Sequence, residues 1–223
     1  ASIVDVGGES TRPGAEPVGL AEEMSRVIPV VEALTRELDV VVSVDTSSAE
    51  LIREATNVGA GLLNDVRALQ SPGALSAAAD SGLPVCLMHM QGRPVTMQNQ
   101  PDYQGVVEEV GEFLLRRVSA CNEAGIDSSQ IILDPGFGFG KTLEHNLDLL
   151  RHLHAFVSTG MPVLVGFSRK SMIASVLGRD VDKRLAGSLA LALLSVQSGA
   201  RIVRVHDVAE TSDVIKMYRA VLG

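Results

Sequence analysis

Residues 131–142 read IILDPGFGFGKT, and this stretch shows the pattern that decides the fold. An apolar run ends in a carboxylate, Asp134, and in a glycine-rich loop, and a helix-like stretch follows. Six other runs end in the same way: residues 3–7, 40–45, 62–66, 85–90, 162–168 and 202–207. Strands that are apolar on both faces suit a parallel sheet covered by helices, so the sequence predicts an α/β fold.

Seven strands are one fewer than a closed (β/α)8 TIM barrel contains. The first run begins at Ile3, which leaves no room for an earlier strand and helix, so we expect the first βα unit to be missing from this chain. The chain has 223 residues, is 46% hydrophobic and has no linker-like tract. It therefore predicts a single barrel domain over residues 1–223 with a substantial core.

Charge and hydropathy exclude several classes of protein. A net charge of −8 argues against a general nucleic-acid binder, because neutralising phosphates needs a basic surface. The longest mostly apolar stretch, residues 189–196, is too short to span a bilayer, and the amino end has no signal pattern. We expect a cytoplasmic protein without membrane partners, in which Cys86 and Cys121 are reduced structural thiols.

Polar residues close each apolar run, at the strand ends where ligands of parallel α/β folds bind. They are Asp5, Asp45, Asn64 with Asp65, His89, Asp134, Ser168 with Lys170, and Arg204 with His206. The same loops carry a cationic set: Arg12, Lys141, Arg169, Lys170 and Arg204. Cations gathered on an acidic protein predict an anionic small-molecule ligand.

The first loop, GGESTRPGA at residues 7–15, is the most specific local signal. Its glycines allow close backbone approach, Ser10 and Thr11 offer hydroxyls, and Arg12 offers a fork of donors before Pro13. These groups together predict a phosphate site. The alternative is a tight turn with an exposed arginine.

Asp45, Asn64 and Asp134 form a second constellation of strand-end residues. Two carboxylates and an amide can bind the edge of a heterocycle that is rich in NH groups, and Phe139 can stack on a planar ring. Each carboxylate taken alone can instead be a helix cap, since Asp45 precedes a helical pattern by a few residues. Three such residues at strand ends favour the ligand interpretation.

Two later segments predict an anion site. FSRKS at residues 167–171 opens a helix, where backbone N–H groups favour anions. In RVHD at residues 204–207, Arg204 and His206 are two apart and would share one face of a strand. The segment between the runs at 85–90 and 131–136 is longer than the others. Its residues 91–105 form a long polar loop that is either a lid or a surface insertion, and a predicted helix follows over about 106–124.

These motifs resemble the dihydropteroate synthase family of the bacterial folate pathway. The resemblance rests on DVGGESTRPGA, SVDTS, LLNDV, LMHM, ILDPGFGFGKTLEHN, VGFSRKS and RVHDV, in this order and spacing over the whole chain. It implies an enzyme, a transferase that joins 6-hydroxymethyl-7,8-dihydropterin diphosphate to p-aminobenzoate and releases pyrophosphate. It also implies Mg²⁺, a sulfonamide target and a homodimer. The family's metal-binding Asn belongs to a loop before Ala1, so no metal ligand is assigned here.

The resemblance also implies roles for individual residues. The pterin contacts would be Asp45, Asn64, Met88, Asp134, Phe139, Gly166 and Lys170. The diphosphate contacts would be Arg12, Arg204 and His206, and the p-aminobenzoate contacts would be Thr11, Pro13, Lys170 and Ser171. Asp45, Lys170 and Arg204 would be the catalytic residues, with Asp45 stabilising a pterin cation after pyrophosphate leaves.

Two alternatives stay open at this point. One is a methyltransferase that acts on methyltetrahydrofolate, which shares the pterin-binding barrel but needs no cationic diphosphate site. The other is a barrel that binds pterin without turnover.

Overall fold

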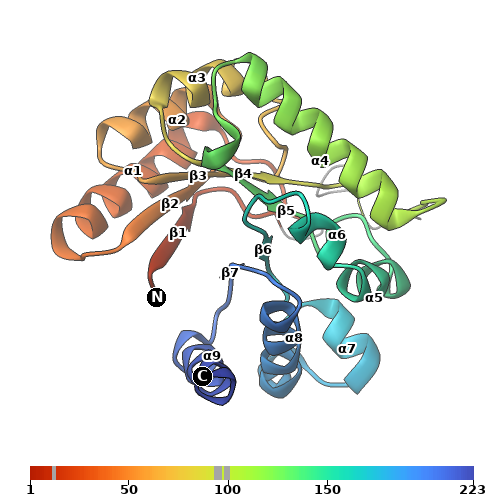
Figure 1. Cartoon of the computed structure of the whole chain (residues 1–223). Helices are drawn as coiled ribbons and strands as arrows, with labels where there is room; N and C mark the ends of the chain where they lie inside the picture. The colour runs from red at the N-terminus through yellow and green to blue at the C-terminus, as the bar shows by residue number, and fades with distance from the viewer. Residues whose placement is uncertain (12–13, 93–96, 98–100) are drawn as a thin grey trace.

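The structure, a computed structural model, describes residues 1–11, 14–92, 97 and 101–223. Parallel strands lie side by side in chain order, with helices along the outer side of the curved sheet (Figure 1). The strands are β1 Ile3–Gly7, β2 Val41–Asp45, β3 Leu62–Asp65, β4 Val85–Met88, β5 Ile131–Asp134, β6 Leu164–Val165 and β7 Ile202–Val203. Each coincides with one of the apolar runs, so the predicted α/β class with a parallel sheet is confirmed.

The strands form a five-stranded sheet, β1 to β5, and a two-stranded sheet of β6 and β7. A single parallel bridge between Leu133 and Val163 joins β5 to the residues just before β6. Within the described part of the chain, no backbone pairing joins β7 to β1, and the sheet is open there. The strand order is that of the predicted barrel, while barrel closure is not seen.

Helices follow the strands as the sequence predicts. They are α1 Leu20–Glu37, α2 Ala49–Asn57, α3 Ala74–Ser81, α4 Val106–Glu123, α5 Leu143–Arg151, α6 His154–Val157, α7 Ser171–Leu177, α8 Leu185–Gln197 and α9 Val208–Leu222, with short 3-10 turns at Ser128–Gln130 and Val181–Lys183. Local caps begin some of them. Ser48 Oγ accepts a hydrogen bond from the Leu51 amide at the start of α2, and a capping box of Thr142 and His145 begins α5.

Side chains of the strands alternate between two apolar layers. The outward residues pack under the helices in the main core, and they include Leu63, Leu87, Leu133 and Val165. The inward residues form a small separate cluster: Leu62, Cys86, Ile132 and Leu164, with Ile3 and Ile202 against it. The inner cluster lies on the inner side of the curved sheet, and polar residues follow Leu62 and Ile132 two positions later along their strands.

Candidate active site

The inner faces of the strands continue into the polar residues that the sequence singled out. Two residues beyond each member of the inner cluster, on the same face, come Asp5, Asn64, Met88, Asp134, Gly166 and Arg204. The register places Asp45 opposite both Gly7 and Asn64, and Met88 opposite Asp134, whereas Asn64 lies opposite Cys86, so the strand ends are staggered. The alternation of the sheet therefore gathers these residues, together with Asp45, in a polar layer on the inner face near the strand ends, staggered from strand to strand.

Arg204 is the cation at the centre of this layer. Its Nε lies 2.7 Å from Asp5 Oδ2 and its Nη2 lies 3.5 Å from Asp45 Oδ2. Asn64 Nδ2 donates to the same Asp5 oxygen at 3.2 Å. Half of the Arg204 side chain is exposed, whereas both carboxylates are largely buried. The guanidinium thus lies over two acids, with part of its surface open to a ligand.

Asp45 is a poor candidate for a helix cap, because Ser48 caps α2 instead. Burial raises the pKa of Asp45 to about 7, the nearby charge of Asp5 adds to the rise, and Arg204 opposes it. A carboxyl group that titrates near neutrality at a strand end is a candidate for chemistry. The structure thus removes the alternative role that the sequence left open for this residue.

Asp134 and Lys170 form a second pair of opposite charges in the layer. Asp134 Oδ1 accepts a hydrogen bond from the Gly136 amide at 2.7 Å. Burial raises the pKa of Asp134, and Lys170 opposes this rise. Burial also lowers the pKa of Lys170 to about 8, against the attraction of Asp134. Lys170 Nζ donates to the carbonyl of Phe137 and lies 4.6 Å from the centroid of the Phe139 ring.

Lys141 does not belong to the cationic set that the sequence predicts at the strand ends. Its side chain is only 3% exposed, and Nζ lies 3.0 Å from the carbonyl oxygens of Gly136 and Phe139 and from His89 Nδ1. Burial lowers the pKa of Lys141 to about 7. The ammonium is directed into the protein, so it holds loops together and offers no charge to a ligand at the strand ends.

Asp65 is also structural. Its carboxylate accepts hydrogen bonds from the amides of Arg67 and Leu69, each at 2.8 Å, and from the Ser47 hydroxyl. The loop after β3 needs this support because Leu69 has a positive φ of 58°. Asn64, one residue earlier, is the strand-end residue that faces the polar layer.

Arg204 and His206 do not share a strand face, contrary to the prediction. Strand β7 ends at Val203, and the Arg204 amide still donates to the carbonyl of Val165 at 2.8 Å. His206 turns toward Ser168 instead, whose Oγ lies 3.2 Å from the His206 amide nitrogen and 2.9 Å from Nδ1. The two residues therefore belong to the loop after β7 and not to one pleat of the sheet.

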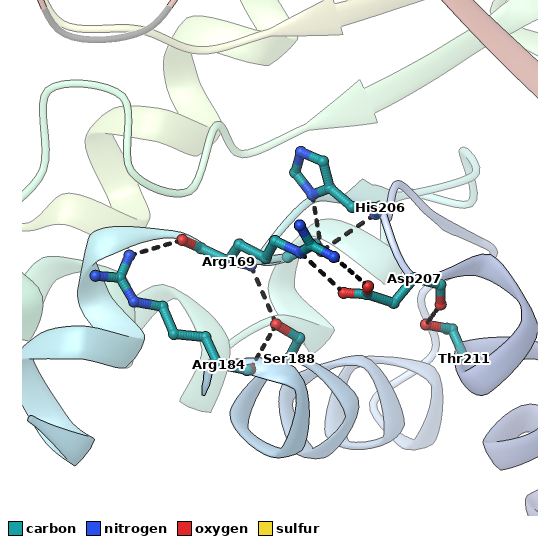
Figure 2. A network of polar contacts seen from close by, with 7 residues as sticks. Arg169, Arg184, Ser188, His206, Asp207 and Thr211 are labelled. Carbon is teal, nitrogen blue, oxygen red and sulfur yellow. Dashed lines mark hydrogen bonds and ion pairs between the residues drawn. The ribbon is translucent and has the colours of Figure 1, made fainter. Parts of the chain in front are cut away.

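Arg169 also differs from the predicted anion-binding role, because its guanidinium pairs with Asp207 (Figure 2). Its Nε lies 3.1 Å from Asp207 Oδ2, and its Nη2 bonds the other oxygen of the same carboxylate. Its backbone has a positive φ of 59° and is bonded on both sides, by Ser188 Oγ to the amide and by Arg184 to the carbonyl. Arg169 therefore ties the loop after β6 to the start of α9.

The other predicted contacts lie around the layer. Thr11 and Asp45 are among the residues that line a cavity of about 230 Å³ beside the first loop. Ser171 is the exposed first residue of α7, and a Cβ added at Gly166 would lie 3.7 Å from Arg204 Cβ, an ordinary contact. Arg12 and Pro13 lie outside the described residues, as does much of the 91–105 loop that was predicted to be either a lid or an insertion.

The described residues contain neither a metal-binding cluster of side chains nor a membrane-spanning helix. No three or more His, Cys, Asp or Glu side chains in residues 1–11, 14–92, 97 and 101–223 are grouped so as to hold a metal ion. In the same ranges, none of the helices combines the length and apolarity needed to cross a membrane.

Comparison with known proteins gives the family. The family model described as pterin binding enzyme matches residues 1–206. The chain belongs to the pterin binding enzyme family. It is 53% identical to the dihydropteroate synthase of Escherichia coli K12, over 100% of this chain and 79% of that protein. It is 54% identical to the enzyme of Haemophilus influenzae, over 99% of this chain and 80% of that protein.

Solved structures of the family agree with the fold. A Yersinia pestis dihydropteroate synthase in complex with a sulfonamide drug matches with a TM-score of 0.97 and 50% identity, over 99% of this chain and 80% of that chain. A Xanthomonas albilineans dihydropteroate synthase with 4-aminobenzoic acid matches with a TM-score of 0.96 and 48% identity, over 100% and 80%. The function of this member of the family is that of a dihydropteroate synthase, a transferase of folate biosynthesis. These matches favour the synthase over the methyltransferase and the binding-only barrel.

The sequence indicates no role for two residues that the structure gives specific partners, Asp5 and His89. Asp5 follows the pattern of a strand-end acid, but its main partner, Arg204, lies 199 residues away in the chain. His89 lies outside the polar layer, where it is buried against Lys141 and makes a T-shaped contact with the Phe113 ring. The only signal for Asp5 was the two-residue alternation along β1, which places it on the face of Ile3.

Proposed function

We propose that the polar layer above the inner cluster is the pterin and diphosphate site of the synthase reaction. The observation that carries the proposal is the convergence of Asp45, Asn64 and Asp134 on one face of the strand ends, with Arg204 and Lys170 beside them. Carboxylate and amide oxygens can accept hydrogen bonds from the NH edge of the pterin. Met88, Phe139 and Gly166 would border the ring.

The diphosphate would lie on the cationic side of this layer. Arg204 is half exposed and would contact it, together with His206 and Arg12. Charge-assisted hydrogen bonds from a guanidinium suit phosphate oxygens well. The p-aminobenzoate would then approach between the first loop and α7, near Thr11, Pro13, Lys170 and Ser171.

The proposed chemistry breaks the bond between the exocyclic CH2 of the pterin and the diphosphate oxygen. The electron pair leaves with pyrophosphate, and the charge it leaves is shared between CH2 and the pterin ring. Ionised Asp45 would stabilise this cation, while Arg204 would bind the departing anion. The amine of p-aminobenzoate then forms the new C–N bond and loses a proton. No nucleophile of the protein takes part.

We expect Mg²⁺ to accompany the diphosphate, because a hard cation prefers oxygen ligands. Among the described residues, no three or more His, Cys, Asp or Glu side chains lie together so that they could hold a metal ion. No step that depends on the metal is therefore assigned to them. The relatives crystallised with 4-aminobenzoic acid and with a sulfonamide support the same ligands for this protein. A homodimer and a cytoplasmic location stay predictions.

The test is turnover by the full-length protein with both substrates and Mg²⁺, measured as pyrophosphate release and as dihydropteroate formed. Asp45→Asn should lower kcat by roughly 10²–10³, as for loss of a group that stabilises a transition-state charge. Asp213→Asn is the control, since Asp213 is an exposed residue of α9. An Asp45→Asn enzyme as fast as the control would contradict the role of Asp45.

A further inference from the structure

Asp5 occupies an unusual place among the acids of the polar layer. One of its oxygens, Oδ2, accepts hydrogen bonds from both Arg204 Nε and Asn64 Nδ2. Its other oxygen, Oδ1, is buried and has no hydrogen-bond partner among the described residues. A single carboxylate thus contacts Arg204, which is proposed to bind the diphosphate, and Asn64, which is proposed to bind the pterin. None of the roles proposed above uses Asp5.

We propose that Asp5 is a positioning residue of the synthase reaction, which fixes the orientations of Arg204 and Asn64 and competes with Asp45 for the guanidinium. The proposal rests on the function proposed above for these three residues. It goes beyond that function because Asp5 itself touches neither substrate in it.

The first argument is geometric. Arg204 Nε lies 2.7 Å from Asp5, whereas Nη2 lies 3.5 Å from Asp45. Asp5 is therefore the closer partner, and it sets the plane of the guanidinium while the far side of the side chain stays exposed. By accepting from Asn64 Nδ2, Asp5 also fixes which end of that amide is its donor. The amide oxygen is left as an acceptor for a ligand NH.

The second argument is electrostatic. Four charged groups act on Asp45 from the elements around it: Asp5 from β1, Arg204 after β7, Asp65 from β3 and Glu23 from α1. After burial, the charge of Asp5 is the largest cause that raises the pKa of Asp45, and Arg204 lowers it. Because Asp5 also holds Arg204 at the shorter distance, it weakens the attraction that would otherwise keep Asp45 ionised.

The consequence is a measurable pH dependence. Asp45 must be ionised to stabilise a pterin cation, so the rate should fall on the acid side as Asp45 is protonated. Removing the charge of Asp5 lowers the pKa of Asp45 and leaves Arg204 to pair with Asp45 alone. The acid limb of the pH profile should then move to lower pH.

The experiment compares kcat from pH 5.5 to 9 for the full-length wild-type enzyme, Asp5→Asn and Asp5→Ser. Both variants remove the charge, and Asn alone keeps an acceptor of similar reach for Arg204. We expect the acid limb to shift down by about one pH unit or more in each variant. We also expect KM for the pterin diphosphate to rise more in the Ser variant than in the Asn variant. Either variant alone decides the question if the other fails to fold.

Asp5→Glu is the charge-retaining control, and its acid limb should stay near that of the wild type. A uniform loss of rate with an unmoved acid limb, in a folded Asn or Ser variant, would reduce Asp5 to a structural residue and overturn the proposal. Asp45→Asn separates this failure from a failure of the proposed function. If Asp45→Asn keeps the wild-type acid limb, the role of Asp45 is wrong; if it loses activity while Asp5→Asn leaves the limb in place, only the role of Asp5 is wrong.

Discussion

Lys141 Nζ lies 3.0 Å from His89 Nδ1, in a site where both side chains are buried. When Lys141 is protonated, the imidazole nitrogen must accept this hydrogen bond, because an ammonium group can only donate. Burial, and then the charge of Lys141, lowers the pKa of His89 to about 3. His89 is therefore neutral at physiological pH, and the pair joins the loop after β4 to the loop after β5.

Lys141→Met should destabilise the protein, because it leaves the carbonyls of Gly136 and Phe139 without their buried donor. We expect the free energy of unfolding to fall by about 1–3 kcal/mol at pH 7, measured by denaturant titration. The folded pKa of Lys141, about 7, lies below its ordinary value of 10.5. The unfolded chain thus binds more protons between these values, and this group adds stability as pH rises from 7 toward 10.5.

The difference in stability between wild type and Lys141→Met should accordingly widen across that pH window. Lys216→Met is the matched control, since Lys216 is exposed on α9 and pairs only with exposed Asp213 in the described structure. It should change stability by less than about 0.5 kcal/mol. A Lys141 difference that stays constant with pH would contradict a lowered pKa for the buried ammonium.

Gly136 lies in the loop after β5, at the point where this loop passes close to the backbone carbonyl of His89. Its φ is +71°, and a Cβ added there would lie 1.8 Å from the His89 oxygen. Gly136→Ala should therefore destabilise the protein by more than about 1 kcal/mol and weaken pterin binding, since Asp134 and Phe139 flank the loop. Thermal unfolding and calorimetry with a pterin analogue measure the two effects.

Gly111→Ala is the control for this variant. Gly111 lies within α4, and nothing lies within 4 Å of a Cβ added there. Alanine favours a helix over glycine, so this variant should gain up to about 1 kcal/mol. If both variants are equally stable, the close approach at His89 is not a constraint on the loop.

The strand positions could be predicted because each run is short, almost wholly apolar and has a clear polar end. The burial of a charged side chain that follows the end of a strand could not be predicted. Lys141 and Lys170 both follow strand ends in glycine-rich or helix-starting loops, yet one donates into the protein and the other lies over Phe139 at the polar layer. Only the packing of two loops against each other distinguishes them, and that packing is set by residues distant in the chain.

Ser168 is the residue that places His206. Its hydroxyl oxygen lies 2.9 Å from His206 Nδ1. Ser168→Ala should release the imidazole and weaken pyrophosphate binding by about 0.5–1.5 kcal/mol, the usual net contribution of one hydrogen bond. Calorimetry with pyrophosphate tests this, with Ser175→Ala, an exposed change within α7, as the control. Equal affinities in the two variants would place His206 outside the diphosphate site.

The candidate site was predictable as a set of residue types, and less so as a set of contacts. The ends of the apolar runs correctly placed Asp45, Asn64 and Asp134 at the carboxyl ends of neighbouring strands. Alternation along the strand predicted a shared face for Arg204 and His206. It failed after β7, where the strand ends at Val203 and the next residues leave the pleat. The ion pair between Asp5 and Arg204 joins β1 to the loop after β7, and no local pattern in the sequence can indicate it.

Asp134→Asn tests the pterin site without changing its shape. The Asn oxygen can still accept the hydrogen bond from the Gly136 amide, so the loop should keep its conformation. The variant loses the negative charge that would pair with the NH edge of the pterin. Affinity for a diphosphate-free pterin should fall by about 1.5–3 kcal/mol, as for a hydrogen bond to a charged group.

The same variant should change Lys170. Because Asp134 raises the pKa of Lys170 against the effect of burial, removing its charge should move that pKa below about 8. Any part of pterin binding that needs the ammonium should then be lost at a lower pH than in the wild type. Calorimetry from pH 6 to 9 measures both effects, with Asp213→Asn as a charge-matched control. Unchanged affinity at every pH would leave Asp134 only the task of holding the Gly136 loop, and the pterin would have to bind elsewhere along the strand ends.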